Sequence, residues 1–267
     1  MALIKEKKEG ILYLTLNRPE VHNSLDPETV VELANVWEEF RGDNDVRVAI
    51  ITGAGDKSFC SGADLARLIP LISGARKPET DADHAILKDP TYRQRALLRD
   101  FELYKPVIAA INGHAIAGGM ELVQATDIRI AAENATFGLQ EVKWGLFPMG
   151  GSTVRLPRQI PFAYAMEILL TGERISADEA HRLGFVNRVV PREKVLEEAE
   201  KIAAKIAENG PISIKAIKES VIKNIGVPIK DGMMKEIEIG APVFFTEDAK
   251  EGPRAFKEKR KPNFVGR

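Results

Sequence analysis

The sequence has few of the features that mark secreted or membrane-spanning proteins. Its 267 residues contain a single cysteine, Cys60, so no intramolecular disulfide can form, and a reducing compartment is indicated. No apolar run approaches the roughly 20 residues that cross a bilayer. The opening residues, Met1-Ala2-Leu3-Ile4-Lys5, are too few and too charged to begin a signal peptide. We therefore expect a cytoplasmic protein that does not associate with membranes.

An excess of charge of one sign is also missing. The 38 Lys and Arg residues nearly balance the 39 Asp and Glu residues, which gives a formal net charge of -1. No global field therefore favours binding to nucleic acid. The nucleotide-binding patterns GxGxxG and GxxxxGKT are absent, and Gly53-Ala54-Gly55 alone is too weak a signal. His114 has no partners at metal-ligand spacing, so we expect no metal site and no tightly bound cofactor.

Hydrophobic residues make up 44% of the chain and charged residues 29%, which is typical of a globular protein with a sizeable core. Runs rich in β-formers alternate with segments of helical periodicity, as in an α/β architecture. The expected strands are residues 11–16, 46–52, 107–111 and 127–131, and the expected helices between them are residues 27–40 and 118–125.

The C-terminal third changes to a helical pattern. Ser176-Ala177-Asp178-Glu179 predicts the capped start of a short helix, and further helices are expected in residues 191–209, in 212–225 and from 228 onward. The last of these ends in Val243-Phe244-Phe245, which is apolar enough to pack against another subunit. The polar stretch 74–89 is predicted to be a mobile loop.

Three motifs indicate chemistry, in the order 59–65, 118–122 and 137–141. Gly118-Gly119 follows a strand and opens a helix, so its backbone N–H groups are free to face an anion. Glu121 and Glu141 stand among apolar neighbours, where a carboxyl has a raised pKa and can transfer protons near neutrality. The alternative interpretation is that Gly118-Gly119 is only a tight strand-to-helix connection and that Glu121 and Glu141 are two surface glutamates. Cys60 and His114 are interpreted as structural residues.

In these motifs and their order the chain resembles the enoyl-CoA hydratase/isomerase family, often called the crotonase family. The departures are small: Ser61, Met120 and Trp144 stand where other residues are commoner. Between Leu68 and Tyr92 nothing defines the family. The resemblance otherwise runs nearly end to end and includes residues 17–25, 61–64, 105–113, 145–148 and 251–260.

The resemblance implies a fold and an activity. The fold would be an α/β, crotonase-like ββα spiral core in residues 1–195, followed by a C-terminal helical trimerisation region in residues 196–267. The activity would be hydration of a 2-enoyl-CoA thioester to a 3-hydroxyacyl-CoA, in the degradation of fatty acids or related acyl groups. An enoyl-CoA isomerase or another hydro-lyase on a specialised acyl-CoA is the alternative. A non-catalytic or RNA-binding relative is disfavoured by the two glutamates and the near-neutral charge.

The same resemblance assigns roles to residues. Glu121 would act mainly as the base toward water, and Glu141 would deliver the proton to C2. The N–H groups of Ala63 and Gly118 would form the oxyanion hole. The substrate would be bound as a coenzyme A thioester, and the protein would be a homotrimer or hexamer. In this assembly Phe256 and Lys259 would reach the site from the neighbouring subunit. The alternative is that the basic run around them is only a solvated surface. The substrate-binding set is His22, Ser24, Ser61, Ala63, Asp64, Leu65, Gly118, Phe256 and Lys259.

Overall fold

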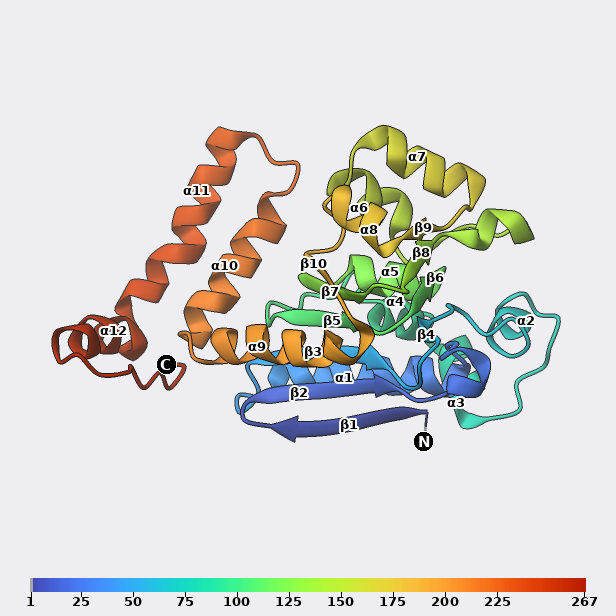
Figure 1. Ribbon diagram of the computed structural model, residues 1–267. Coiled ribbons are helices and arrows are strands. Elements are labelled where there is room, and N and C mark those ends of the chain that lie inside the picture. Colours follow the sequence, from blue (N-terminus) through green and yellow to red (C-terminus); the bar gives the residue numbers. More distant parts are fainter. Residues whose placement is uncertain (1) are drawn as a thin grey trace.

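The computed structural model describes residues 2–267 and contains two β-sheets (Figure 1). In the larger sheet the strands lie in the order β1-β2-β3-β5-β7-β10, and every neighbouring pair after the β1–β2 hairpin is parallel. These strands are β1 Leu3–Lys8, β2 Ile11–Leu16, β3 Val48–Gly53, β5 Val107–Ile111, β7 Ile128–Ala132 and β10 Arg188–Val190.

The smaller sheet has the strand order β4-β6-β8-β9. Its strands are β4 Ser58–Cys60, β6 His114–Ile116, β8 Thr136–Gly138 and β9 Ile175–Ser176. Along the chain, β3, β5 and β7 belong to the larger sheet, while β4, β6 and β8, which follow them, belong to the smaller one. Each such pair of strands leads into helical structure, so the chain climbs as a repeated ββα spiral. The predicted α/β spiral core is confirmed.

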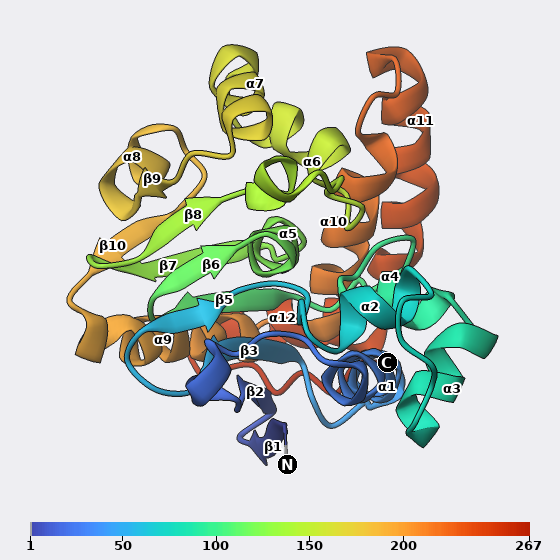
Figure 2. The same ribbon diagram turned by 90° about the vertical axis from the view of Figure 1, so that its right-hand side faces the viewer.

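Helices cover both sheets (Figure 2). α1 packs against α4 and α3, α5 lies beside β6, and α9 lies against β3, β5 and β7 of the larger sheet. The strand β5 is buried at every position, which explains its continuous apolar sequence. The helices up to this point are α1 Pro27–Gly42, α2 Leu68–Ile72, α3 Asp81–Lys88, α4 Thr91–Ala96, α5 Gly118–Gln124, α6 Ser152–Gln159, α7 Phe162–Thr171, α8 Ala177–Arg182 and α9 Val195–Ala207.

The predicted mobile loop at residues 74–89 is wrong for residues 81–88, which form α3. Thr80 caps this helix in a reciprocal capping box with Asp83. The Asp83 carboxylate is fully buried and accepts hydrogen bonds from the Arg76 guanidinium at 2.7 and 2.8 Å and from the N–H of Glu79 at 2.8 Å. A buried carboxylate with hydrogen-bond partners thus stabilises a helix in a segment whose polar composition had indicated a loop.

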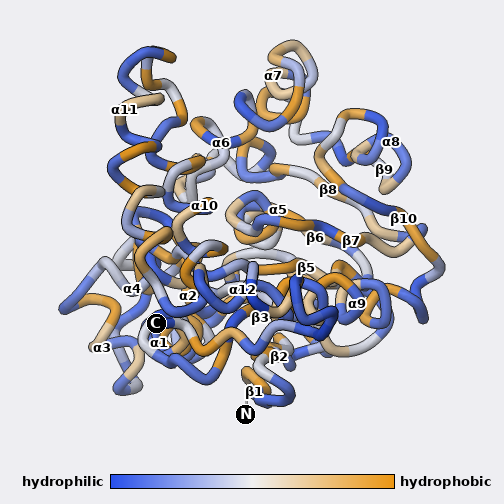
Figure 3. The backbone as a smooth tube through the Cα atoms, turned by 90° about the vertical axis from the view of Figure 1, so that its left-hand side faces the viewer, coloured by the Kyte–Doolittle hydropathy of each residue, from blue (hydrophilic) through white to orange (hydrophobic). Residues whose placement is uncertain are grey.

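The last helices stand apart from the sheets: α10 Pro211–Asn224, α11 Ile229–Gly240, the 3₁₀ turn η4 Ala241–Phe245 and α12 Glu247–Lys257. Figure 3 shows hydrophobic residues recurring along α11, and Ile229, Phe244 and Phe245 are at least 80% exposed. Because α9 still covers the larger sheet, the projecting region begins at α10. The division into domains at residue 195 stays a prediction. Within residues 2–267, no helix combines the length and apolar character that crossing a bilayer requires.

Candidate active site

Two glycines allow the end of β4 to lie against the start of α5. Gly62 has φ +90°, and a Cβ there would lie 2.8 Å from the backbone nitrogen of Gly118. A Cβ on Gly119 would overlap the carbonyl oxygen of Cys60. The two segments therefore meet backbone to backbone, which only glycine permits. As a result, the Cβ position of Gly118 lies 3.6 Å from the backbone nitrogen of Ala63.

The N–H groups of Ala63 and Gly118 are both available. Leu25 and Ala63 form an isolated parallel bridge, in which Leu25 donates to the carbonyl of Gly62 at 2.8 Å and accepts from the N–H of Asp64 at 2.9 Å. The N–H of Ala63, between those two residues, points away from Leu25. Gly118 is the first residue of α5, so its N–H has no partner within the helix. The preceding Ala117 has φ 52° and ψ -126°, a strained conformation of the kind found at functional sites.

Glu121 lies one turn into α5 and is almost completely buried. Its Oε1 accepts a long hydrogen bond of 3.4 Å from the N–H of Ser152, and Gly150 leaves room for the other oxygen, since a Cβ there would lie 2.5 Å from Oε2. Burial raises the pKa of the Glu121 carboxyl, and the bond from Ser152 opposes this shift only in part.

Glu141 lies in the 3₁₀ turn η2 Gln140–Trp144. Its Oε2 is buried without a hydrogen-bond partner among the residues that the structure describes. Burial, with a smaller contribution from the negative charge of Glu121, raises the pKa of Glu141 to about 7. The two carboxyl groups therefore titrate as a coupled pair, and protonation of one favours ionisation of the other.

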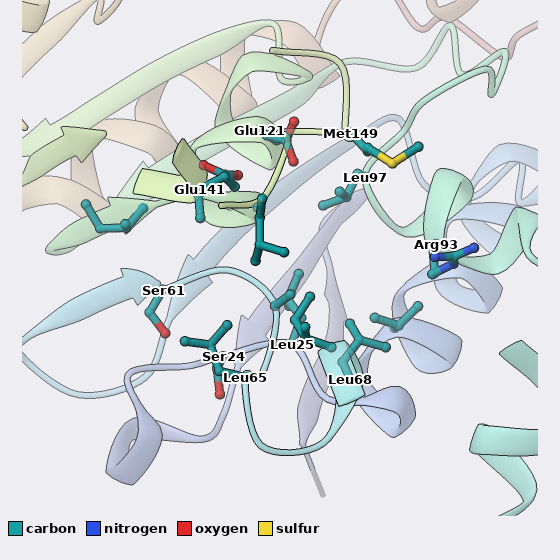
Figure 4. Close-up of a pocket in the computed structure, with 18 of the residues that line it drawn as sticks. Ser24, Leu25, Ser61, Leu65, Leu68, Arg93, Leu97, Glu121, Glu141 and Met149 are labelled. Carbon is teal, nitrogen blue, oxygen red and sulfur yellow. The ribbon is translucent and has the colours of Figure 1, made fainter. Parts of the chain in front are cut away.

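Both glutamates line one cavity of about 820 Å³ (Figure 4). The cavity brings together most of the residues that the sequence predicted. Eight of them line it: His22, Ser24, Ser61, Ala63, Leu65, Gly118, Glu121 and Glu141.

Asp64 does not line the cavity but supports the loop that does. Its carboxylate accepts from Arg18 Nη1 at 3.0 Å and from the N–H groups of Ala66 and Arg67 at 3.0 and 3.1 Å. These bonds fix the turn that follows Ala63 and thereby the direction of its N–H. Contact between Asp64 and coenzyme A stays a prediction.

Phe256 and Lys259 also lie outside this cavity. Phe256 is 86% exposed on α12, and Lys259 is exposed just beyond the end of that helix. The family resemblance implies that both reach the site of a neighbouring subunit, and this role stays a prediction.

The histidines and the cysteine near the cavity have structural partners. His22 Nδ1 lies 2.9 Å from Ser58 Oγ, and His114 Nδ1 lies 2.9 Å from Thr136 Oγ1. Burial lowers the pKa of His114, so its ring is neutral at physiological pH. Cys60 is buried, which raises the pKa of its thiol to about 12 and leaves it unreactive. Residues 2–267 contain no cluster of His, Cys, Asp and Glu that could hold a metal ion.

Arg155 is a residue of this site that the sequence analysis missed. Its guanidinium donates to the carbonyl of Leu98 at 2.6 Å and to those of Leu97 and Gly150 at 3.3 Å. Leu97 and Gly150 lie beside Glu121, because a Cβ on Gly150 would lie within 2.6 Å of both the Leu97 side chain and the Glu121 carboxylate. Arg155 thus joins two walls of the cavity, and no local motif signals such a contact.

Comparison with known proteins shows the family of the chain. The profile of the enoyl-CoA hydratase/isomerase family matches residues 6–267. The chain belongs to this family. It is 44% identical to the enoyl-CoA hydratase EchA19 of Mycobacterium tuberculosis, over 98% of this chain and 96% of that protein. It is 42% identical to the (E)-benzylidenesuccinyl-CoA hydratase of Thauera aromatica, over the whole of both chains.

A crystal structure of enoyl-CoA hydratase from Bacillus anthracis resembles the protein with a TM-score of 0.90 and 39% identity, covering 100% of both chains. The spiral core and the C-terminal helices therefore follow the fold of the family. Hydratases at 40–44% identity over nearly the whole chain identify this family member as an enzyme of the hydro-lyase type.

Proposed function

We propose that the protein hydrates 2-enoyl-CoA thioesters to 3-hydroxyacyl-CoA, with Glu121 and Glu141 as its acid–base pair. The observation that carries this proposal is that the buried Glu121 and the half-buried Glu141 line the same cavity as Ala63 and Gly118, whose N–H groups are free. Hydration needs these two kinds of group together, because negative charge develops on the thioester oxygen while water attacks C3.

The proposed reaction begins with the thioester oxygen between the N–H groups of Ala63 and Gly118. Each preorganised donor of this kind lowers the barrier by about 3 kcal/mol. Glu121 removes a proton from water as the new C3–O bond forms, and the electrons of the double bond move toward the thioester. Glu141 then gives its proton to C2. Its pKa of about 7 keeps much of this carboxyl protonated at neutral pH, as an acid in this step requires.

The substrate supplies the coenzyme A, and we propose no tightly bound cofactor. His22, Ser24, Ser61 and Leu65 line the cavity, and we assign their part of it to the coenzyme. The relatives act on different acyl groups, since one is named for enoyl-CoA and another for benzylidenesuccinyl-CoA. Isomerisation of an enoyl-CoA is the second candidate, but two carboxyl groups at one cavity favour hydration, which uses both.

The test is the loss of enoyl-thioester absorbance when purified protein meets crotonyl-CoA. We expect turnover by the wild type, and a fall of at least about 10²-fold in kcat for Glu121→Gln and for Glu141→Gln, because each removes one acid–base group. The double variant should lose little more than either single variant, since both groups serve one water.

Glu20→Gln, at an exposed position, is the matched control. Wild-type turnover in either single variant would remove that residue from the mechanism. Turnover of a 3-enoyl-CoA but not of crotonyl-CoA would instead indicate an isomerase.

A further inference from the structure

An arginine without a partner lines the cavity. Arg99 pairs with Asp100 at 3.5 Å and Arg174 donates to Gln140 Oε1 at 3.0 Å, but the guanidinium of Arg93 has neither a hydrogen bond nor an ion pair among the described residues. Its Nε is buried. Water can solvate the outer part of this guanidinium but not a buried N–H, and an unpaired polar group of this kind costs free energy.

Arg95, on the same helix, also has a buried Nε without a partner among the described residues, but its terminal nitrogens are paired. It donates to Asp89 Oδ2 at 3.3 Å and to Thr91 Oγ1 at 2.8 Å, and its guanidinium lies over the Tyr92 ring at 4.6 Å. Arg95 does not line the cavity. Within the described chain, the two arginines of α4 therefore differ in their terminal nitrogens, which are paired in Arg95, outside the cavity, and unpaired in Arg93, which lines it.

Arg93 lies on the side of the cavity that the acyl chain would occupy. Leu97, the C-cap residue, follows it by four residues, so the two lie on one side of the helix, about 6 Å apart along its axis. Leu97 is the residue beside the Glu121 carboxylate. In Figure 4, Ser61 and Ser24 lie at the opposite side of the cavity from Arg93. The thioester end would thus lie away from Arg93, and the chain beyond C3 would point toward it.

The wall between the glutamates and Arg93 is mainly apolar. It includes Leu68, Leu97 and Met149. Apart from Glu121 and Glu141, no acidic residue of the described chain lines this cavity, so Arg93 meets no fixed carboxylate there. The acyl group that complements this part of the cavity is apolar beyond C3 and carries a negative charge at the end that meets Arg93.

On the basis of the proposed function, we propose that the preferred substrates are 2-enoyl-CoA thioesters whose acyl group carries a second carboxylate, bound by Arg93. The planar guanidinium can donate two parallel N–H bonds to a carboxylate. The terminal nitrogens of Arg93 are the donors for such a pair, since no described residue takes them.

The experiment compares substrates that differ only in the terminal group. Hex-2-enedioyl-CoA and oct-2-enedioyl-CoA are assayed beside hex-2-enoyl-CoA and oct-2-enoyl-CoA. We expect the wild type to have the higher kcat/KM for the dicarboxylic member of at least one pair. Arg93→Met should lower the ratio of kcat/KM values, dicarboxylic over monocarboxylic, at least about tenfold. Arg95→Met, which removes the same charge from the same helix, should leave this ratio unchanged.

Binding measurements separate this inference from the proposed reaction. Adipoyl-CoA and hexanoyl-CoA have no double bond to hydrate, so calorimetry measures their affinities without turnover. Tighter binding of adipoyl-CoA that is lost in Arg93→Met supports the role of Arg93 even if hydration fails. A wild type that hydrates both series but prefers the methyl-terminated members, with the same ratio in Arg93→Met, would overturn the inference and leave the hydratase proposal standing.

Discussion

The surroundings of Glu141 disfavour the ionised form of its carboxyl. One of its oxygens is buried with no hydrogen-bond partner in residues 2–267, and its pKa is raised to about 7 by burial and by the charge of Glu121. Ionisation at this position therefore costs folding free energy that a functional role has to justify. The same cost makes the carboxyl a proton donor near neutral pH, so local instability and proposed catalysis have one cause.

This cost predicts how stability depends on pH. In the unfolded chain Glu141 has its ordinary pKa of 4.5, so between about pH 4.5 and 7 the folded state binds more protons than the unfolded state. The favourable contribution of the protonated carboxyl is complete below pH 4.5 and is lost as pH rises through 7. Glu141→Gln cannot ionise, so its stability relative to the wild type should rise across this window, by a few kcal/mol at most because a pKa unit is worth about 1.4 kcal/mol.

Urea denaturation of both proteins from pH 4 to 9 measures this difference, with Glu20→Gln as the control for loss of one exposed charge. Parallel stability curves for wild type and Glu141→Gln would show that Glu141 ionises without cost, contrary to its burial.

At the scale of the elements, local patterns predicted what local forces determine. The strand β5 and the helices α1 and α5 form where apolar runs and helical spacing indicate them. The exchange of strands between two sheets was implied only by the family resemblance, because strand order depends on contacts between distant segments.

The sequence also predicted only part of the candidate site. Its glutamates and glycines stand in recognisable motifs, and the cavity contains them. The wall formed by Leu97, Gly150 and Arg155 brings together distant parts of the chain, and the unpaired state of Arg93 depends on what surrounds it. Neither can be seen in a sequence pattern.

The two glycines that open α5 should respond differently to a methyl group. In Gly118→Ala the new Cβ meets its neighbours at 3.4 Å or more, so the fold should survive. That Cβ would nevertheless stand 3.6 Å from the Ala63 nitrogen, in the space proposed for the thioester oxygen. We therefore expect kcat with crotonyl-CoA to fall at least about tenfold while the melting temperature changes little.

Gly119→Ala is the contrasting variant, because its Cβ would overlap the backbone of Cys60 and force β4 and α5 apart. This change should lower the melting temperature well below that of Gly118→Ala. Circular dichroism melts and crotonyl-CoA kinetics on both proteins test the pair. A folded Gly118→Ala enzyme with normal kcat would be incompatible with an oxyanion between Ala63 and Gly118.

At the scale of the whole molecule, the projecting helices expose several large apolar side chains. Ile229 and Phe244 are 80% exposed and Phe245 is 82% exposed, while Met233 and Ile237 of α11 are more than half exposed. Large contiguous surfaces of this kind mark sites of association. A second or third copy of the chain is the partner that we propose, since the same surface is then buried in every copy.

Assembly gives the last prediction. Light scattering should report a mass three or six times the 29.5 kDa of the chain. The double variant Phe244→Asp with Phe245→Asp should dissociate, because burying two carboxylates in an apolar interface is costly. Ile4→Asp, at a half-exposed position on β1, is the matched control and should keep the wild-type mass. A monomeric wild type at micromolar concentration would remove the interface and, with it, any way for Lys259 of one copy to reach the coenzyme in another.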